Sequence, residues 1–180
     1  MPRKTINDWL DNANRYLDAS RYEDAIKYFN KVLELDRKHK KAWFRKGCTL
    51  GKLGRHEGAI HCYDKALELD KKFKKAWNNK GYALAKLGRH EDAIRCYDKV
   101  LNLDQNSPKA WNNIGYALAK LGQCEDAITY CDKALTLDAN YVSAWDSKGY
   151  ALVVLGRHED ALICYDKALD LDKKYKGAWC

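Results

Sequence analysis

Six tryptophans recur in this chain at a constant interval of 34 residues. They are Trp9, Trp43, Trp77, Trp111, Trp145 and Trp179. A fixed period between about 20 and 50 residues indicates an array in which each repeated unit buries its apolar face against its neighbours. We therefore expect a single array over 1–180, made of repeats 6–39, 40–73, 74–107, 108–141 and 142–175 and a partial sixth repeat, 176–180. Positions within a repeat are numbered as slots, with the tryptophan in slot 4.

Each repeat carries two helical patterns separated by a turn. In the third repeat, residues that recur every three or four positions share one helix face, and these are Trp77, Gly81, Leu84 and Leu87. Gly88 interrupts this pattern, and a second one follows through Ala93, Ile94, Tyr97, Val100 and Leu101. Each repeat is thus predicted to be a helix (helix A), a tight turn and an antiparallel helix (helix B), which makes the chain all-α.

Small residues occupy two slots that are predicted to face each other. Slot 20 is always alanine, and slot 8 is glycine in repeats 2 to 5: Gly47, Gly81, Gly115 and Gly149. Because glycine inside a helix costs ~1 kcal/mol relative to alanine, these glycines predict close contact between helices A and B. Slot 15 is also glycine in repeats 2 to 5, which suits a left-handed turn after helix A. In the first repeat Ser20 takes that slot, and with Glu23 it is predicted to form a capping box for helix B.

These slots resemble the tetratricopeptide repeat (TPR), a helix–turn–helix unit of the same period. The shared positions are tryptophan in slot 4, glycine in slot 8, alanine in slot 20, an aromatic ring in slot 24 and a small residue in slot 27. Cys131 replaces the ring in repeat 4, and slot 32 lacks the family's proline, which is expected to loosen the junctions. The resemblance implies a right-handed α-solenoid of about five TPR units plus the start of a sixth. The phrase AWNNKGYALAKLGRHEDAI is also similar to TPR arrays of methanogenic archaea.

Motifs for catalysis or metal binding are absent from the sequence. It contains no phosphate-binding loop and no G-x-S-x-G, H-E-x-x-H or C-x-x-C motif. Three histidines share slot 17, but they lie one repeat apart and cannot converge on a metal: His56, His90 and His158. Cys62, Cys96 and Cys164 share another slot, and a spacing of roughly 10 Å between repeats is too long for a disulfide. We therefore predict that the protein is not an enzyme and that it holds no cofactor and no metal.

The sequence predicts no membrane span, because it has no apolar stretch of 18 residues. Its beginning, MPRKTINDWL, lacks the apolar segment of a secretory signal. The cysteines are expected to be buried and reduced, which fits a cytoplasmic location.

The formal charge of +8 is concentrated in two repeats. Residues 40–73 contain nine basic and four acidic residues (+5), and residues 74–107 contain seven and four (+3). The three other full repeats each carry −1. The basic charge therefore belongs to repeats 2 and 3.

In the TPR family the A helices line a concave groove, and the resemblance implies that slots 2, 5, 6, 9, 12 and 13 point into it. Helical geometry places slots 2, 5, 9, 12 and 13 on one stripe, away from the packing stripe of slots 4, 8 and 11. The candidate partner-binding residues in these slots are Lys41, Phe44, Arg45, Lys52, Lys75, Asn78, Asn79, Tyr82, Lys86, Lys109, Asn112, Asn113, Tyr116, Lys120, Asp146 and Tyr150. Lysines offer charge, asparagine amides can bond a peptide backbone, and tyrosines offer rings with a polar tip. An extended acidic peptide or a free carboxylate terminus would suit this surface.

The leading hypothesis is a non-enzymatic protein–protein interaction scaffold that binds an extended acidic segment of a partner in the groove. Single-stranded RNA is a first alternative, because basic repeats with rings can stack bases, although the 25 acidic residues count against nucleic acid. A self-associating array is a second alternative, because the last full repeat would leave Leu162, Tyr165 and Leu169 uncovered. That end indicates either a fragment of a longer array, which we favour, or end-to-end pairing in an oligomer.

Overall fold

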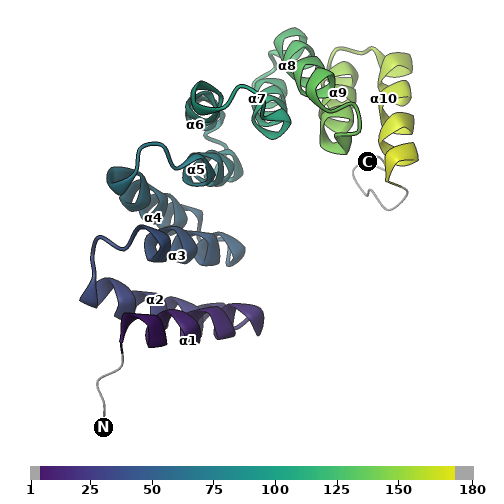
Figure 1. The fold of residues 1–180 in the computed structure, drawn as a ribbon. Helices are drawn as coiled ribbons and strands as arrows, with labels where there is room; N and C mark the ends of the chain where they lie inside the picture. Colours follow the sequence, from purple (N-terminus) through teal and green to yellow (C-terminus); the bar gives the residue numbers. More distant parts are fainter. Residues whose placement is uncertain (1–4, 173–180) are drawn as a thin grey trace. The chain divides into compact units, whose positions relative to one another are not determined.

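A computed structural model describes residues 5–172 of the chain, and all of its regular elements are α-helices (Figure 1). They are α1 (Ile6–Asp18), α2 (Tyr22–Leu35), α3 (Lys40–Lys52), α4 (His56–Leu69), α5 (Lys74–Lys86), α6 (His90–Leu103), α7 (Pro108–Lys120), α8 (Cys124–Leu137), α9 (Val142–Val154) and α10 (His158–Leu171). Odd-numbered helices are the A helices and even-numbered helices are the B helices of the five repeats. The predicted all-α solenoid of helix–turn–helix repeats is confirmed, whereas its handedness stays a prediction and the partial sixth repeat lies outside the described residues.

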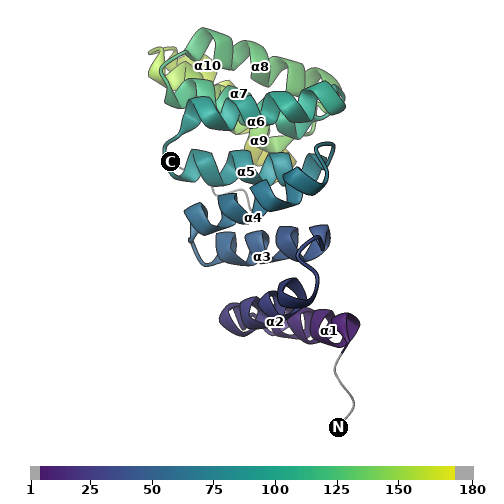
Figure 2. The same cartoon turned by 90° about the vertical axis from the view of Figure 1, so that its left-hand side faces the viewer.

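The chain divides into two compact units, one up to Leu87 and one from Gly88. Unit 1 contains α1 to α5 and unit 2 contains α6 to α10, so the division falls inside the third repeat. Within each unit every helix packs against the next, and Figure 2 shows α3, α4 and α5 as successive layers of unit 1. Neighbouring A helices also touch, α3 with α5 and α7 with α9, more closely than neighbouring B helices of the same unit do. The A helices therefore form the inner layer of each unit, while the extent of one array over 1–180 stays a prediction.

The glycines of slot 8 lie where helices A and B are in closest contact. A Cβ placed on Gly47 would lie 2.7 Å from a ring carbon of Tyr63 and 3.2 Å from the carbonyl oxygen of Ala59. A Cβ on Gly115 would lie 2.8 Å from the sulfur of Cys131, which fills slot 24 in place of the ring. The predicted close approach is confirmed, and slot 24 provides most of the contact.

The turns after the A helices use the left-handed backbone that slot 15 predicts. Gly54, Gly122 and Gly156 have φ values of 73°, 79° and 75°. Ser20 has the same conformation in the first repeat, with φ 55°. The predicted capping box is therefore wrong, because Ser20 lies one residue before the N-cap of α2, which is Arg21 without a side-chain cap bond. The serine takes the role of the glycine rather than that of a cap.

The same hydrogen bonds hold each junction between repeats, although slot 32 lacks proline. The tryptophan indole donates to the carbonyl oxygen of slot 32, six residues earlier, over 2.8 to 2.9 Å in the pairs Trp43–Arg37, Trp77–Lys71, Trp111–Gln105 and Trp145–Ala139. The aspartate of slot 31 accepts from the backbone N–H two residues later, as Asp36 does from Lys38 over 2.8 Å. The tryptophan and the aspartate thus fix the connection without proline.

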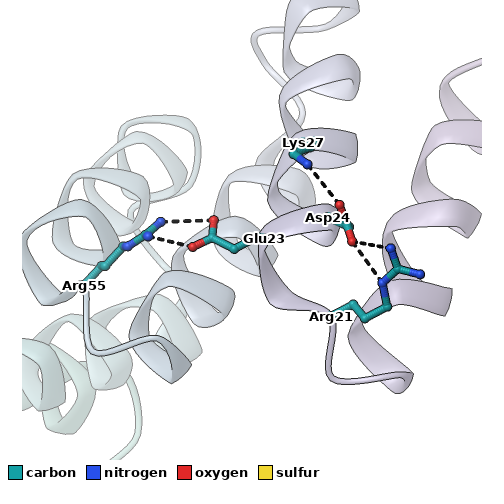
Figure 3. Close-up of polar contacts among 5 residues, drawn as sticks. All are labelled: Arg21, Glu23, Asp24, Lys27 and Arg55. Carbon is teal, nitrogen blue, oxygen red and sulfur yellow. Dashed lines mark hydrogen bonds and ion pairs between the residues drawn. The ribbon is translucent and has the colours of Figure 1, made fainter.

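Ion pairs link several repeats at the surface. Arg55 of the second repeat binds both carboxylate oxygens of Glu23 in the first, over 2.6 and 3.1 Å (Figure 3). Glu23 lies on α2, and the next residue of that helix, Asp24, accepts hydrogen bonds from Arg21 and Lys27 (Figure 3). Such exposed pairs contribute only about 0.2–1 kcal/mol each, so they add little to the stability of the fold.

Cys48, Cys62, Cys124, Cys131 and Cys164 are free thiols, and all of them except Cys48 are buried. Burial raises the pKa of Cys62 to about 11 and that of Cys131 to about 12, which makes both poor nucleophiles. Over residues 5–172 no cluster of three or more His, Cys, Asp or Glu side chains could hold a metal. None of the described helices is long and apolar enough to cross a membrane.

Candidate functional site

Two A helices expose the same row of side chains. Slots 2, 9 and 13 are seven and four residues apart, so they lie nearly in line on a helix of 3.6 residues per turn. On α5 the row is Lys75, Tyr82 and Lys86, and on α7 it is Lys109, Tyr116 and Lys120. All six residues are exposed, with Tyr82 at 54% and Tyr116 at 40%. We call these two rows the Lys–Tyr–Lys stripes.

The lysines of slots 2 and 13 have no acidic partner, unlike Lys80 and Lys148 on the same layer of A helices. Lys80 pairs with Asp64 over 2.5 Å, and Lys148 pairs with Asp132 over 2.7 Å. Both pairs join slot 7 of one repeat to slot 25 of the previous repeat. By contrast, the lysines of slots 2 and 13 on the described A helices are exposed and form no ion pair; they are Lys41, Lys52, Lys75, Lys86, Lys109 and Lys120. Their charge is therefore available to a partner.

In each stripe the lysine of slot 13 lies against a tyrosine ring. The ammonium of Lys86 lies 5.3 Å from the ring centroid of Tyr82. That of Lys120 lies 5.3 Å from the Tyr116 centroid and 4.1 Å from the Tyr150 centroid. The ammonium also donates a hydrogen bond to the Tyr150 hydroxyl, which raises the pKa of Lys120 above its usual value. Lys120 is thus a positioned cation at neutral pH.

Polar side chains link slot 9 of one A helix to slot 6 of the next in unit 1. Arg45 donates to the Asn14 side chain over 2.7 Å, and the amide of Asn79 donates to the sulfur of Cys48 over 3.3 Å. The side-chain amide of Asn78 also donates to Asn79 Oδ1 over 3.4 Å. Arg45 is therefore exposed but already hydrogen-bonded to a residue of the preceding repeat. Asn14 and Cys48, which take part in these bonds, belong to the same surface of the A helices as Arg45 and Asn79.

The structure gives two of the predicted residues a different setting. Phe44 is half-buried, and its ring centroid lies 4.8 Å from that of Phe73 and 5.9 Å from that of Tyr63, so we assign it to packing. Lys52 is exposed, but its ammonium lies 5.3 Å from the ring centroid of Tyr22 on α2. The remaining predicted residues, Asn113, Asp146 and Tyr150, are half-buried on α7 and α9.

Asn112 is the most unusual of the predicted residues. Its side chain is only 5% exposed, and its Oδ1 atom accepts no hydrogen bond. A buried acceptor without a donor costs about 1–3 kcal/mol. On α7, Asn112 precedes Tyr116 by four residues and Lys120 by eight, so all three share one helix face. Unit 2 therefore contains an unused acceptor below its Lys–Tyr–Lys stripe.

Sequence reasoning missed the apolar end of α9. Slot 13, lysine in repeats 2 to 4, is valine there, and Val153, Val154 and Leu155 are 40%, 50% and 36% exposed. The substitution at slot 13 was the available signal. In unit 2 the inner layer thus changes from a lysine on α7 to an aliphatic patch on α9.

A cavity of about 330 Å³ lies elsewhere in unit 2, among α8, α9 and α10. Its lining combines apolar groups such as Ile128, Trp145 and Leu152 with the Asp132–Lys148 pair. The charges of Lys148 and Asp132 neutralise each other, and so do those of Arg157 and Asp160, so this cavity offers less unpaired charge than the stripes do. On α10, Leu162 and Ile163 are 61% and 58% exposed.

Profiles of the tetratricopeptide repeat match residues 10–47, 41–73, 62–95, 108–141 and 142–175, and a TPR repeat profile matches residues 81–122. Together they extend over residues 10–175. No curated protein matches the chain.

Several solved structures share the fold at low sequence identity. MamA (residue 41 to the end) from Desulfovibrio magneticus RS-1 has a TM-score of 0.85, with 22% identity over 95% of this chain and 97% of that one. PilW, a type IV pilus biogenesis factor, has a TM-score of 0.83, with 22% identity over 97% and 81%. YrrB, a TPR protein with an unusual peptide-binding site, has a TM-score of 0.76, with 22% identity over 97% and 90%. Since the repeat profiles succeed one another along five helix pairs with the same slots, the chain belongs to the tetratricopeptide-repeat family.

Proposed function

We propose that the chain is a non-enzymatic protein–protein interaction scaffold that binds an extended acidic segment of a partner along its A helices. The observation that carries the proposal is the set of exposed lysines in slots 2 and 13, which lack the acidic partners that Lys80 and Lys148 have. Unpaired charge on an inner helix layer attracts a segment of opposite charge and raises its rate of association. The peptide-binding site of YrrB, a structure of similar fold, is consistent with this use.

The two kinds of side chain in the stripes support complementary contacts with an extended peptide. Lysine ammonium groups can bond Asp and Glu side chains, and exposed tyrosines such as Tyr82 can cover apolar stems while their hydroxyls bond the backbone. The partly buried Asn78 and Asn79 can meet the peptide backbone from the floor of the same surface.

Fluorescence anisotropy with two labelled peptides of twelve residues tests the proposal. One peptide alternates Glu with Gly and Ser, and the other replaces every Glu by Gln. We expect the acidic peptide to bind more tightly, with an affinity that falls as salt screens the charges. Equal binding of both peptides, or no binding of either, would contradict an acidic partner.

Single-stranded RNA is the competing ligand, because exposed tyrosines between lysines can also stack bases. A labelled oligouridylate in the same assay distinguishes the two ligands. Binding of the oligouridylate with a steep salt slope and no binding of the acidic peptide would replace the protein partner by RNA.

Three further expectations remain predictions. A cytoplasmic location is consistent with the free thiols of Cys62, Cys131 and Cys164. The similarity to TPR arrays of methanogens rests only on the amino-acid sequence of the repeats. End-to-end self-association is consistent with the exposure of Leu162, and light scattering over a range of concentrations tests it.

A further inference from the structure

Lys120, on the inner layer of unit 2, is an exposed cation that neighbouring rings hold in place. Lys120 lies between the rings of Tyr116 on its own helix and Tyr150 on α9, whose centroids are 6.3 Å apart. Contacts with two rings and a hydroxyl restrict the side chain before any partner binds. A restricted lysine loses less conformational entropy when it meets a carboxylate.

An aliphatic patch lies beside this cation. Val154 occupies on α9 the slot that Lys120 occupies on α7, and α7 and α9 are in contact. Val153 and Val154 follow Tyr150 by three and four residues, so they adjoin its ring on the helix surface. A ligand that reaches Lys120 across Tyr150 therefore meets exposed apolar surface next.

We propose, resting on the scaffold function above, that the α7–α9 face of unit 2 selects an extended segment in which an acidic and an aliphatic residue are two positions apart. The acidic side chain binds Lys120, and the aliphatic one packs on Val153 and Val154. Side chains two positions apart in an extended chain point the same way and are separated by roughly 7 Å. Neighbouring helix axes are about 8–10 Å apart, and Lys120 leans toward α9, so this spacing fits.

Selection from a random library of twelve-residue displayed peptides on the immobilised full chain tests the inference. We expect acid-x-aliphatic or aliphatic-x-acid triplets to be enriched. Lys120→Glu should remove the acid from the selected triplets, and Val154→Lys should remove the aliphatic residue. The exchange Lys120→Val with Val154→Lys should retain selection of both. Lys133→Glu, the same charge change on α8, serves as the control and should select the same peptides as the original chain.

The outcomes separate this inference from the scaffold function. Acidic peptides that are selected without the triplet, and equally by the Lys120→Glu and Val154→Lys variants, would overturn the inference and leave the scaffold proposal in place. Selection without any excess of acidic residues would overturn both. Val154→Lys restores the residue that this slot carries in repeats 2 to 4, so a fold that tolerates the change is expected.

Discussion

A single methyl group decides how closely helices A and B can approach. At Gly47 an added Cβ would overlap the ring of Tyr63, at 2.7 and 2.9 Å. At Gly51, one turn later on the same helix, it would meet only the Tyr63 hydroxyl at 3.8 Å. The two glycines of α3 therefore have different roles, although both lie inside a helix.

These distances predict opposite effects for the same substitution. Gly51→Ala should stabilise the protein by about 0.5–1 kcal/mol, because alanine favours the helix and nothing obstructs it. Gly47→Ala should destabilise it by about 1–2 kcal/mol, because the overlap outweighs the same helical gain. Chemical denaturation followed by circular dichroism measures both. Two variants of equal stability would show that the ring of Tyr63 moves away without cost.

Ser20 provides a second residue-level prediction. It adopts the left-handed conformation that Gly54 adopts in the next repeat. Because that conformation costs a residue with a Cβ about 1–2 kcal/mol, Ser20→Gly should raise the stability of the protein by about 1 kcal/mol despite the greater flexibility of the unfolded chain. Gly54→Ser should lower it. A loss of stability in Ser20→Gly would mean that the serine hydroxyl has a role that the backbone geometry does not reveal.

At the scale of elements, the period of the sequence predicts the helix pairs, the turns and the contact at slot 8, because these depend on residues within one repeat. The settings of Phe44 and Asn112 could not be predicted, although both occupy slot 5. Phe44 packs on Phe73, which only the loop before α5 brings near, and Asn112 is buried without a donor. The pairing of Lys80 with Asp64 likewise depends on how one repeat packs on the next.

The second repeat shows how an ion pair can couple two helices to pH. Lys40 at the start of α3 binds Asp70 at the end of α4 over 2.6 Å. The hydrogen bond from Lys40, with one from the backbone N–H of Lys72, holds the pKa of Asp70 below its usual 3.8. A carboxyl with a lowered pKa stabilises the fold fully above pH 3.8, and this contribution is lost as the pH falls through the lowered value.

Lys40→Met should therefore reduce stability near neutral pH, and its difference from the original chain should shrink as the pH falls below 3.8. Thermal midpoints over about pH 2 to 7 measure this difference. Lys65→Met, which removes an exposed lysine paired with Glu68 on α4, controls for the loss of a surface charge. A difference that grows toward low pH would contradict the assigned role of Asp70.

At the scale of the whole molecule, the function depends on charge that the fold leaves unpaired. Lys75→Glu with Lys109→Glu reverses one lysine in each stripe, and both side chains are exposed. We expect this double variant to lower the affinity for the acidic peptide at least about tenfold, because two attractions become repulsions. Helicity should persist, which circular dichroism checks.

A matched double variant distinguishes position from net charge. Lys71→Glu with Lys99→Glu makes the same charge change at two exposed positions outside the stripes. We expect this control to bind the acidic peptide almost as well as the original chain does, apart from the weaker long-range attraction. Equal losses in both double variants would show that the protein attracts acids by its net charge and has no defined site.

The binding surface on the A helices is tested most directly by a titration of the isotope-labelled chain with the acidic peptide, followed by amide chemical shifts. We expect the largest shifts along the stripes, at Lys75, Tyr82, Lys109 and Tyr116, and little change in the B helices. Shifts concentrated on the B helices, or spread evenly over the chain, would contradict a binding surface formed by the unpaired lysines of the A helices.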